Sequence, residues 1–337
     1  MKQVWITRPG PPEVLRVREA ADPTPGTGEV RVRVKAAGIN FADLLARVGL
    51  YPDAPKIPCV VGYEVSGTID RLGGGVNDLS LGERVFAMPK FGGYSDVLVL
   101  PRAQVLKMPA QMTFEEAAAI PVNYLTAHHM MFFTGVLRPG STVFVHSAAG
   151  GVGLAAIQLA KTRGCTIIGT ASPSKHDFLR AHGAAHPIDS GVDYVAAVRK
   201  IVGERGVDLI LDPVGGRSWT DGYNLLGAGG RLVVFGLSAA ASGTRRNMLH
   251  AVSTLLKIKK WNPMKLMDEN KSITGVNMGH LFNRPDLLLP QFAALIQMYE
   301  DGQIKPHVAR TFRFEEASAA HQFIHDRKAT GKVLLVP

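Results

Sequence analysis

A glycine-rich segment, Ala148–Gly153, constrains the fold of this chain more than any other feature. It reads Ala-Ala-Gly-Gly-Val-Gly and lies between an apolar run, Ser141–His146, and a helix-forming run, Gly151–Thr162. Strand, glycines and helix in this order are what a dinucleotide-binding turn requires. The glycines alone are weak evidence, so the segments that follow them decide what the turn means.

Strand-forming and helix-forming runs alternate after this turn. In chain order they are strand Thr166–Thr170, helix Lys175–His182, helix Tyr194–Val202, strand Val207–Leu211, helix Arg217–Leu226, strand Arg231–Phe235 and strand Ser272–Val276. This alternation predicts βαβ crossovers around a buried parallel sheet. We therefore predict an α/β fold with a Rossmann doubly wound parallel sheet in the middle of the chain.

The N-terminal third follows another pattern, in which short β-like runs are interrupted by glycine and proline. Val30–Lys35 alternates apolar and basic residues, as a half-buried strand does. Gly67–Asp70, Arg84–Ala87 and Tyr94–Leu100 are further strand candidates. These runs predict a small β-rich, barrel-like domain. We expect the closing segment, Gly331–Pro337, to be a strand that returns to this domain.

Composition and charge exclude several classes of protein. The only cysteines, Cys59 and Cys165, cannot form a disulfide framework or a four-cysteine zinc lobe, and so few fit a reducing, cytoplasmic location. The chain does not begin like a secretory signal, and no apolar run reaches the roughly 18 residues of a membrane span. Its formal charge of +10 comes from scattered residues, which favours a basic surface over a nucleic-acid site.

The glycine-rich turn has a specific interpretation as a ligand site. At Gly150 the missing side chain lets the backbone approach a pyrophosphate, and at Gly153 it lets the helix lie close to the strand. The start of the helix supplies free N–H groups and a positive dipole. A tight turn without a ligand is the alternative, and the βαβ units that follow disfavour it.

The end of the next strand favours NADPH over NADH. An NAD site carries Asp or Glu there, bound to a ribose hydroxyl. In this chain the segment Gly169–Lys175 contains no acid, and the first one is Asp177. Lys175 as a point charge and Ser172 as a donor suit a 2′-phosphate instead. The alternative is that Lys175 is an ordinary surface lysine in the first turn of a helix.

Two later turns are expected beside the glycine-rich turn. Gly215 follows the fourth strand of the sheet, and Phe235, Gly236 and Leu237 follow the fifth. Both turns are expected at carboxyl ends of strands, where open α/β sheets bind their ligands. Either turn alternatively serves only as a connection.

Segments along the whole chain carry a family resemblance. Those with the strongest likeness are Gly38–Asp43, Gly49–Pro52, Gly62–Gly67, Gly82–Val85 and Ala148–Gly153. Together they resemble the quinone oxidoreductase (zeta-crystallin) branch of the medium-chain dehydrogenases/reductases. A second set looks most like the vesicle amine transport protein subfamily: Thr113–Ala119, Val122–Tyr124, Gly169–His176, His186–Asp189, Gly222–Leu226 and Gly331–Pro337.

The resemblance implies a two-domain organisation. A GroES-like substrate domain would comprise residues 1–123 with 277–337, and a Rossmann NADPH-binding domain residues 124–276. A homodimer is usual in this branch and is expected here by analogy.

The resemblance also implies that the chain needs no zinc. At the positions of three zinc ligands in related alcohol dehydrogenases it has Asn40, Tyr63 and Val122. Only Glu64 remains, and one carboxylate does not make a zinc site. We therefore expect no metal.

Site residues follow from the same resemblance and from the turns described above. Asn40, Asp43 and Tyr51 are the expected catalytic residues, and with Thr126 they match positions that line the nicotinamide and substrate cleft. Ser190 stands where the family often places a tyrosine beside the phosphate-binding lysine. The expected cofactor-binding residues are Asn40, Thr126, Ala149, Gly150, Gly151, Val152, Ser172, Lys175, Ser190, Gly215, Phe235, Gly236, Leu237, Asn277 and Lys332.

The absence of a zinc site favours reduction over alcohol oxidation, because nothing would lower the pKa of an alcohol. We expect NADPH-dependent hydride transfer to quinones or α,β-unsaturated carbonyls, with Asn40 and Tyr51 as donors to the oxygen that gains charge. The alternative function is an NADPH-binding, membrane- or partner-associated protein with little turnover. It depends on the basic, amphipathic segment 245–261, which alternatively packs over the cleft or in a subunit interface.

Overall fold

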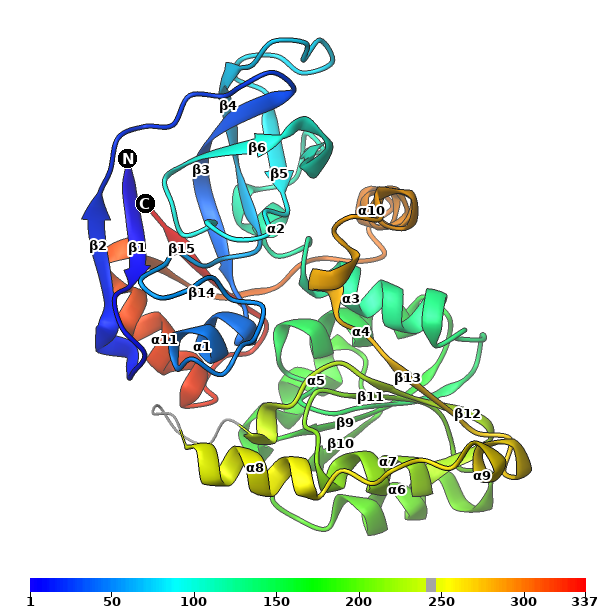
Figure 1. The fold of residues 1–337 in the computed structure, drawn as a ribbon. Coiled ribbons are helices and arrows are strands. Elements are labelled where there is room, and N and C mark those ends of the chain that lie inside the picture. Colours follow the sequence, from blue (N-terminus) through cyan, green and yellow to red (C-terminus); the bar gives the residue numbers. More distant parts are fainter. Residues whose placement is uncertain (241–246) are drawn as a thin grey trace.

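The computed structural model describes residues 1–240 and 247–337, which form two domains, each built around a large sheet (Figure 1). The larger antiparallel sheet has the strand order β14-β15-β3-β4-β5-β7, and β6 pairs with β3. Its strands are β3 (Glu29–Ile39), β4 (Val65–Leu72), β5 (Arg84–Ala87), β6 (Val97–Pro101), β7 (Val105–Lys107), β14 (Val308–Arg313) and β15 (Lys332–Val336). Strands β1 (Lys2–Ile6) and β2 (Leu15–Glu19) form a separate antiparallel ribbon. Only the β14–β15 pair of the large sheet is parallel.

The second sheet is parallel throughout and has the order β10-β9-β8-β11-β12-β13. Its strands are β8 (Thr142–Val145), β9 (Thr166–Ala171), β10 (His186–Asp189), β11 (Val207–Asp212), β12 (Leu226–Val234) and β13 (Ser272–Gly275). The helices between them are α4 (Gly151–Lys161), α5 (His176–His182), α6 (Tyr194–Val202) and α7 (Arg217–Leu225). The chain order starts at β8 in the centre and proceeds outward in both directions, which is the doubly wound arrangement predicted from the alternation.

Alternating side chains of the parallel strands fill two different cores. Val143 and Val145 of β8 pack in one core with α3 (Asn123–His128), α4 and α10 (Pro285–Glu300). Phe144, between them, packs in the opposite core with α6 and α7. Because successive side chains of a strand point to opposite faces, an apolar run such as Thr142–Val145 must be covered on both sides.

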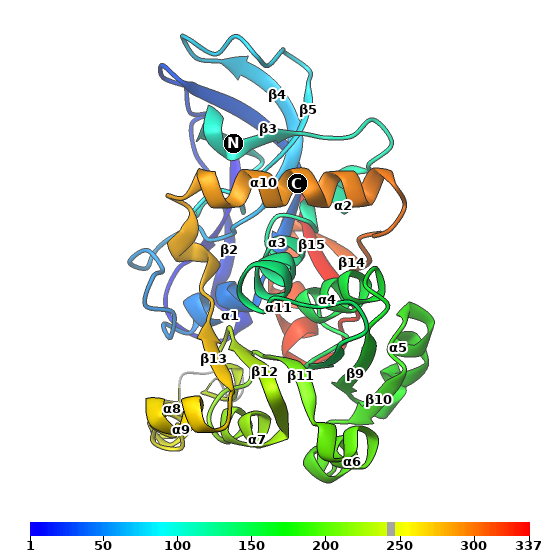
Figure 2. The same ribbon diagram turned by 90° about the vertical axis from the view of Figure 1, so that its right-hand side faces the viewer.

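The end of the chain returns to the first domain, as predicted. Strand β15 pairs antiparallel with β3, and Val333 lies opposite Ile39. Figure 2 shows α10 crossing between the two domains above α3 and α4. The Phe292 ring of α10 contacts the Phe86 ring of β5, with centroids 6.0 Å apart. The remaining helices are α1 (Phe41–Arg47), α2 (Phe114–Ala118), α8 (Met248–Leu256), α9 (Pro263–Asp268) and α11 (Ala317–His325).

Most predicted boundaries are confirmed within two residues, and three strands differ by more. Strand β3 continues four residues beyond the predicted end at Lys35, and β6 begins at Val97, three residues after the predicted start at Tyr94. Helix α5 begins at His176, one residue after its predicted start, because Pro173 first sets a 3₁₀ turn, Pro173–Lys175. Strand β12 begins at Leu226, five residues before the predicted start at Arg231, and a register shift in its pairing with β11 accommodates the glycines there. No helix within residues 1–240 and 247–337 combines the length and apolar character needed to cross a membrane.

Candidate active site and cofactor crevice

The parallel sheet gathers the predicted cofactor-binding turns at one edge. All its strands run in the same direction, so the segments after β8, β9, β11, β12 and β13 lie at the carboxyl edge. The predicted residues at this edge include Gly150 after β8, Ser172 after β9, Gly215 after β11, Phe235 after β12 and Asn277 after β13. This is where a doubly wound sheet binds its ligand.

The two predicted glycine roles differ in the surroundings of each residue. A Cβ at Gly153 would lie 2.6 Å from the Ser147 carbonyl oxygen and 2.7 Å from Ala148 Cα, so helix and turn touch there. A Cβ at Gly150 would meet only the Ser147 oxygen, at 3.3 Å. Gly150 is the N-cap residue of α4 and has an extended conformation. The surroundings of Gly150 are therefore less crowded than those of Gly153, which is required for packing.

The rest of the turn is held by contacts with neighbouring elements. A Cβ at Gly151 would collide with Asn123 Nδ2, so α3 touches the start of α4. Ala149 is buried and its carbonyl accepts the Gly331 N–H at 2.8 Å, whereas Val152 is half-buried on α4. Gly331 belongs to the segment that leads into β15, so the first domain contacts the glycine-rich turn directly.

A second group of polar side chains lies where β15 meets β3. Asn40 Nδ2 donates to Glu64 Oε1 at 2.9 Å, and Lys332 Nζ donates to Asn40 Oδ1 at 2.7 Å. Lys332 and Glu64 form a buried ion pair. The other oxygen of Glu64 accepts the Val122 N–H at 2.8 Å. The sequence predicted Asn40 and Lys332 as separate cofactor-binding residues. Only the structure shows that they contact each other and that both contact Glu64.

Asp43, one of the three predicted catalytic residues, lies behind the Asn40 loop. Its side chain is fully buried, where its Oδ2 accepts the Asn40 N–H at 2.8 Å and its Oδ1 accepts the Gly62 N–H at 3.1 Å. Burial raises the pKa of Asp43 to about 7, although these backbone hydrogen bonds and Lys332 act in the opposite direction. Asp43 therefore holds the Asn40 loop at the start of α1, and its predicted catalytic role stays a prediction.

Sequence reasoning missed the buried partners behind Asp43. Burial and the nearby Asp43 carboxyl raise the pKa of the Tyr94 phenol well above its usual value. The Tyr94 hydroxyl lies 3.2 Å from His321 Nε2 of α11. Burial lowers the pKa of His321 far below its ordinary value, so its imidazole is neutral. Neither Tyr94 nor His321 carries a recognisable sequence signal, because each belongs to an element distant from α1 in the chain.

Tyr51 lies half-buried beside two other aromatic rings. Its ring meets Tyr63 edge-on with centroids 6.2 Å apart, and Tyr63 lies 5.2 Å from Phe91. Burial and the nearby Asp53 raise the pKa of the Tyr51 phenol, which keeps it protonated and able to donate. A Cβ at Gly279 would lie 3.7 Å from the Tyr51 hydroxyl, so this loop reaches the segment after β13.

Asn277 is engaged in a contact between that segment and the Tyr51 loop. Its Nδ2 lies 3.4 Å from Asp53 Oδ2, and its Oδ1 accepts the Gly279 N–H at 3.1 Å. His280 Nε2 lies 2.9 Å from the same Asp53 oxygen. The pKa of Asp53 is lowered, chiefly by this hydrogen bond from His280. Asn277 thus joins the segment after β13 to the loop that carries Tyr51 and Asp53, and its predicted cofactor contact stays a prediction.

Lys175 lies beside the end of β9, as predicted, and two carbonyl groups hold its ammonium. Its Nζ donates to the Arg327 oxygen at 2.5 Å and the Ala329 oxygen at 2.6 Å. Burial lowers the pKa of Lys175 and the nearby Arg327 lowers it further. An ammonium has three hydrogens, so one remains for an anion. The Ser172 hydroxyl lies nearby in sequence and is exposed.

The other predicted residues are placed as follows. Ser190 is exposed after β10, and its N–H donates to the Ala171 oxygen at 3.0 Å. Thr126 is buried on α3. Gly215 has φ of +85°, and its N–H lies 3.3 Å from Asp212 Oδ1, an acceptor that shapes this turn. Gly236 is exposed, and the half-buried side chains of Phe235 and Leu237 flank it.

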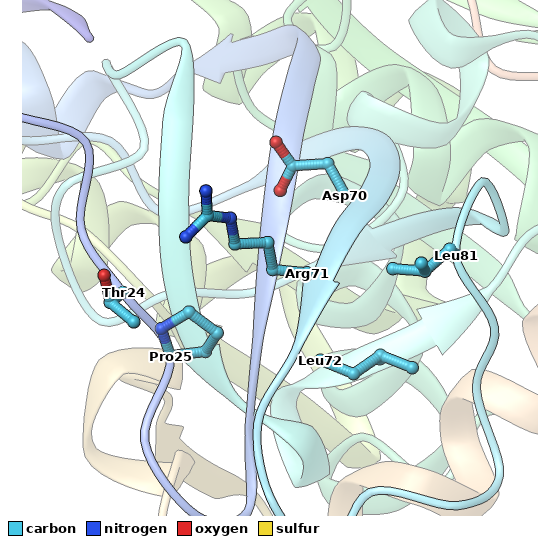
Figure 3. Close-up of a pocket in the computed structure, with 6 residues that line it drawn as sticks. All are labelled: Thr24, Pro25, Asp70, Arg71, Leu72 and Leu81. Carbon is cyan, nitrogen blue, oxygen red and sulfur yellow. The ribbon is translucent and has the colours of Figure 1, made fainter.

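A surface pocket elsewhere does not belong to this site. It has a volume of about 420 Å³ and lies along the far end of β4, lined by Thr24, Pro25, Asp70, Arg71, Leu72 and Leu81 (Figure 3). The Asp70 carboxylate is already bound by Arg31 at 2.8 Å and by Arg33 at 2.9 Å. In the described ranges 1–240 and 247–337, no three His, Cys, Asp or Glu side chains are grouped so that they could hold a metal.

A β-rich domain joined to a Rossmann sheet with a glycine-rich turn defines a nicotinamide-dependent oxidoreductase fold. Residues 26–110 match the family described as alcohol dehydrogenase GroES-like domain, and residues 151–294 the family described as zinc-binding dehydrogenase. The synaptic vesicle membrane protein VAT-1 homolog of Homo sapiens is 41% identical over 325 residues, which are 96% of this chain and 82% of that protein.

Quinone oxidoreductases are similar over the whole chain. The one from Homo sapiens is 32% identical over 342 residues, which cover 100% of this chain and 98% of that protein. The crystal structure of Escherichia coli quinone oxidoreductase complexed with NADPH has a TM-score of 0.87, with 30% identity and 100% of both chains covered. The chain belongs to the medium-chain dehydrogenase/reductase superfamily, in the branch of the VAT-1 homologs and quinone oxidoreductases. The predicted fold class and family are confirmed.

The two glycines of the turn predict different results of substitution: Gly153→Ala should mainly lower stability, and Gly150→Ala should mainly lower cofactor affinity. Gly153→Ala should lower the free energy of unfolding by about 1–3 kcal/mol, the usual cost of overpacking. Gly150→Ala should lower it by less, about 0.5–1 kcal/mol, since its Cβ would meet one carbonyl oxygen at 3.3 Å and its φ of −77° is ordinary. Urea denaturation measures the stabilities and NADPH titration the affinity, which should fall in Gly150→Ala. Equal stability of the two variants would contradict these roles.

The raised pKa of Asp43 predicts a pH dependence of stability. The folded state holds the Asp43 proton up to about pH 7, whereas an unfolded aspartate releases it near 3.8. The stabilising contribution is complete below the unfolded value and is lost as pH rises through about 7. Between pH 5 and 8 the free energy of unfolding should fall by about 2–3 kcal/mol relative to Asp43→Asn, which does not titrate. Urea denaturation at each pH measures this free energy. If it depends on pH in the same way in the unmodified protein and in Asp43→Asn, Asp43 ionises normally.

Proposed function

We propose that this protein is an NADPH-dependent reductase that transfers a hydride to quinones or α,β-unsaturated carbonyls without a metal. The observation that carries the proposal is the contact between the two halves of the site. One half is the glycine-rich turn, where Ala149 accepts a hydrogen bond from the Gly331 N–H. The other half is the Asn40 amide, which accepts a hydrogen bond from Lys332, the residue after Gly331. We also propose a cytoplasmic homodimer, with the domain boundaries expected from the sequence.

The residues at the carboxyl edge suit a phosphorylated dinucleotide. Gly150 leaves room for a pyrophosphate at the start of α4, and the helix supplies free N–H groups there. No carboxylate directly follows β9, and Asp189, at the end of the neighbouring strand, accepts the Gly191 N–H of its own turn. Ser172 and the third hydrogen of Lys175 are the donors for a 2′-phosphate. The similar Escherichia coli quinone oxidoreductase, crystallised as a complex with NADPH, supports the same cofactor here.

The chemistry requires two things of the protein. A bound nicotinamide cofactor supplies the hydride, and the side chains orient the acceptor and stabilise the oxygen that gains charge. The Asn40 amide and the protonated Tyr51 phenol are the donors for that oxygen. Glu64 is the one remaining residue of the zinc ligand positions. Its carboxylate is paired with the Lys332 ammonium, which takes the place of a metal cation. Quinones and enones need no Lewis acid once the hydride donor and these hydrogen bonds are in place.

One surface favours the alternative function, an NADPH-binding protein that associates with a membrane or a partner. Helix α8 packs with Thr254 beside Gly216 but leaves Leu249 and Leu256 87% and 81% exposed. Lys257, Lys259 and Lys260 follow, and all three side chains are exposed. Exposed apolar residues beside lysines suit an anionic lipid surface. Arg245 and Arg246, the start of the predicted basic segment, lie outside the described residues.

Cofactor preference tests the phosphate-binding half of the proposal. NADPH should bind more tightly than NADH, and Lys175→Ala should weaken NADPH roughly 10- to 150-fold because a charge-assisted bond is lost. NADH affinity should hardly change. Lys200→Ala, which removes an exposed lysine on α6, is the matched control and should affect neither cofactor. Fluorescence titration gives all the affinities. Equal affinity of the unmodified protein for both cofactors would refute the proposed preference.

Turnover distinguishes the reductase from the alternative. NADPH oxidation should be detectable with a panel of quinones and enones, and should survive treatment with a chelator. Asn40→Ala and Tyr51→Phe should each lower kcat about 10-fold or more, with little change in melting temperature, because each removes a donor to the developing charge. Asn224→Ala, exposed on α7, and Tyr299→Phe, whose hydroxyl binds Glu116, are matched controls. Tight NADPH binding without turnover on any acceptor would favour the alternative function.

A further inference from the structure

The side-chain amide of Asn40 is held at both ends by a buried ion pair. Its nitrogen donates to Glu64 and its oxygen accepts from Lys332, at 2.9 and 2.7 Å. The side chains of Glu64 and Lys332 are 0% and 3% exposed and contact each other directly. A half-turn of the amide would place its oxygen against a carboxylate and its NH₂ against an ammonium. The amide therefore has a single favourable orientation.

This orientation leaves Asn40 with one hydrogen to donate. An amide nitrogen carries two hydrogens, and Glu64 accepts one of them. The other has no acceptor within the part of the chain that the structure describes, and Asn40 is half-buried, so a small molecule can reach it. The backbone N–H of Asn40 is not available, because Asp43 accepts it at 2.8 Å.

Lys332 reaches Asn40 because of the register between β15 and β3. Val333 lies opposite Ile39, so Lys332 stands one step further, beside Asn40. A Cβ at Gly38 would collide with Glu64 Oε1 and lie 2.6 Å from Lys332 Cε, so the glycine leaves just enough space for the pair. On its other side, Lys332 follows Gly331, which is bonded to the glycine-rich turn.

We propose that Lys332 and Glu64 are positioning residues that orient the Asn40 amide, so that its second N–H donates to the substrate oxygen that gains charge. This inference rests on the proposed reductase function and deepens it. Neither charged side chain touches the substrate. Lys332 also joins the site to the cofactor-binding turn, because its neighbour Gly331 donates to Ala149. The role differs from the direct cofactor contact that the family resemblance implies for Lys332.

Two variants disturb the orientation of the Asn40 amide, and a third serves as the control. Lys332→Met removes the donor to the Asn40 oxygen and leaves Glu64 buried without a cation, which can destabilise the fold. Glu64→Gln/Lys332→Met removes both charges together, so it keeps the fold accessible to measurement if the single variant unfolds. Lys35→Met is the matched control, since Lys35 lies exposed on β3 of the same sheet.

Kinetics test the role in the reaction. In Lys332→Met and in the double variant, kcat for quinone or enone reduction should fall about 10- to 100-fold, as expected when a donor to a developing charge is misdirected. The dissociation constant of NADPH should change less than about 3-fold, since an orienting residue does not bind the cofactor. Lys35→Met should match the unmodified protein in both measurements. A large loss of NADPH affinity with kcat unchanged would make Lys332 a cofactor ligand and overturn the proposal.

Nuclear magnetic resonance of the protein without cofactor tests the orientation independently of turnover. The side-chain amide signals of Asn40 are identified by their loss in Asn40→Ala. Their chemical shifts should move, and their hydrogen exchange should become faster, in Lys332→Met and in the double variant but not in Lys35→Met. Unchanged Asn40 signals would overturn the positioning role. If the unmodified protein reduces no acceptor, the proposed function fails, and these signals still decide whether Lys332 orients Asn40.

Discussion

Glu64 and Lys332 are buried together where β15 pairs with β3, and the arrangement of the candidate active site depends on this ion pair. Lys332 is 292 residues from Asn40 in the sequence. Taking two charges out of water is costly, and their attraction offsets the cost only when further hydrogen bonds satisfy the remaining donors and acceptors. The Asn40 amide and the Val122 N–H supply them. The pair therefore ties the loops at Asn40 and Val122 to the last strand of the chain.

The two domains depend on each other through the same strand. Gly331, immediately before β15, donates to the Ala149 carbonyl in the glycine-rich turn of the parallel sheet. Its φ of +94° favours glycine, and a Cβ there would lie 2.5 Å from the His307 oxygen. A side chain at this position would therefore collide with the His307 backbone. A chain of direct contacts thus runs from the glycine-rich turn through Gly331 and Lys332 to Asn40.

Behind Asn40, a buried polar group supports the loop from inside the first domain. Asp43 binds the N–H groups of Asn40 and Gly62, so a single carboxyl holds two loops. Its raised pKa shows that burial outweighs these hydrogen bonds. Tyr94 and the neutral His321 complete the group. The resemblance placed Asp43 among the catalytic residues, and the structure adds that its carboxyl supports the Asn40 loop.

The sequence by itself determined the parallel sheet, its edge and the glycine-rich turn, because hydrophobic periodicity and glycine spacing are local properties. It also identified Asn40, Lys175 and Lys332 as residues of interest. Only the tertiary structure decided that Glu64 and Lys332 hold Asn40, that Asp43 is buried, and that Asp53 meets His280. Each of these three features brings together distant parts of the chain. Their contacts follow from strand register and domain packing, which residue types and local spacing do not encode.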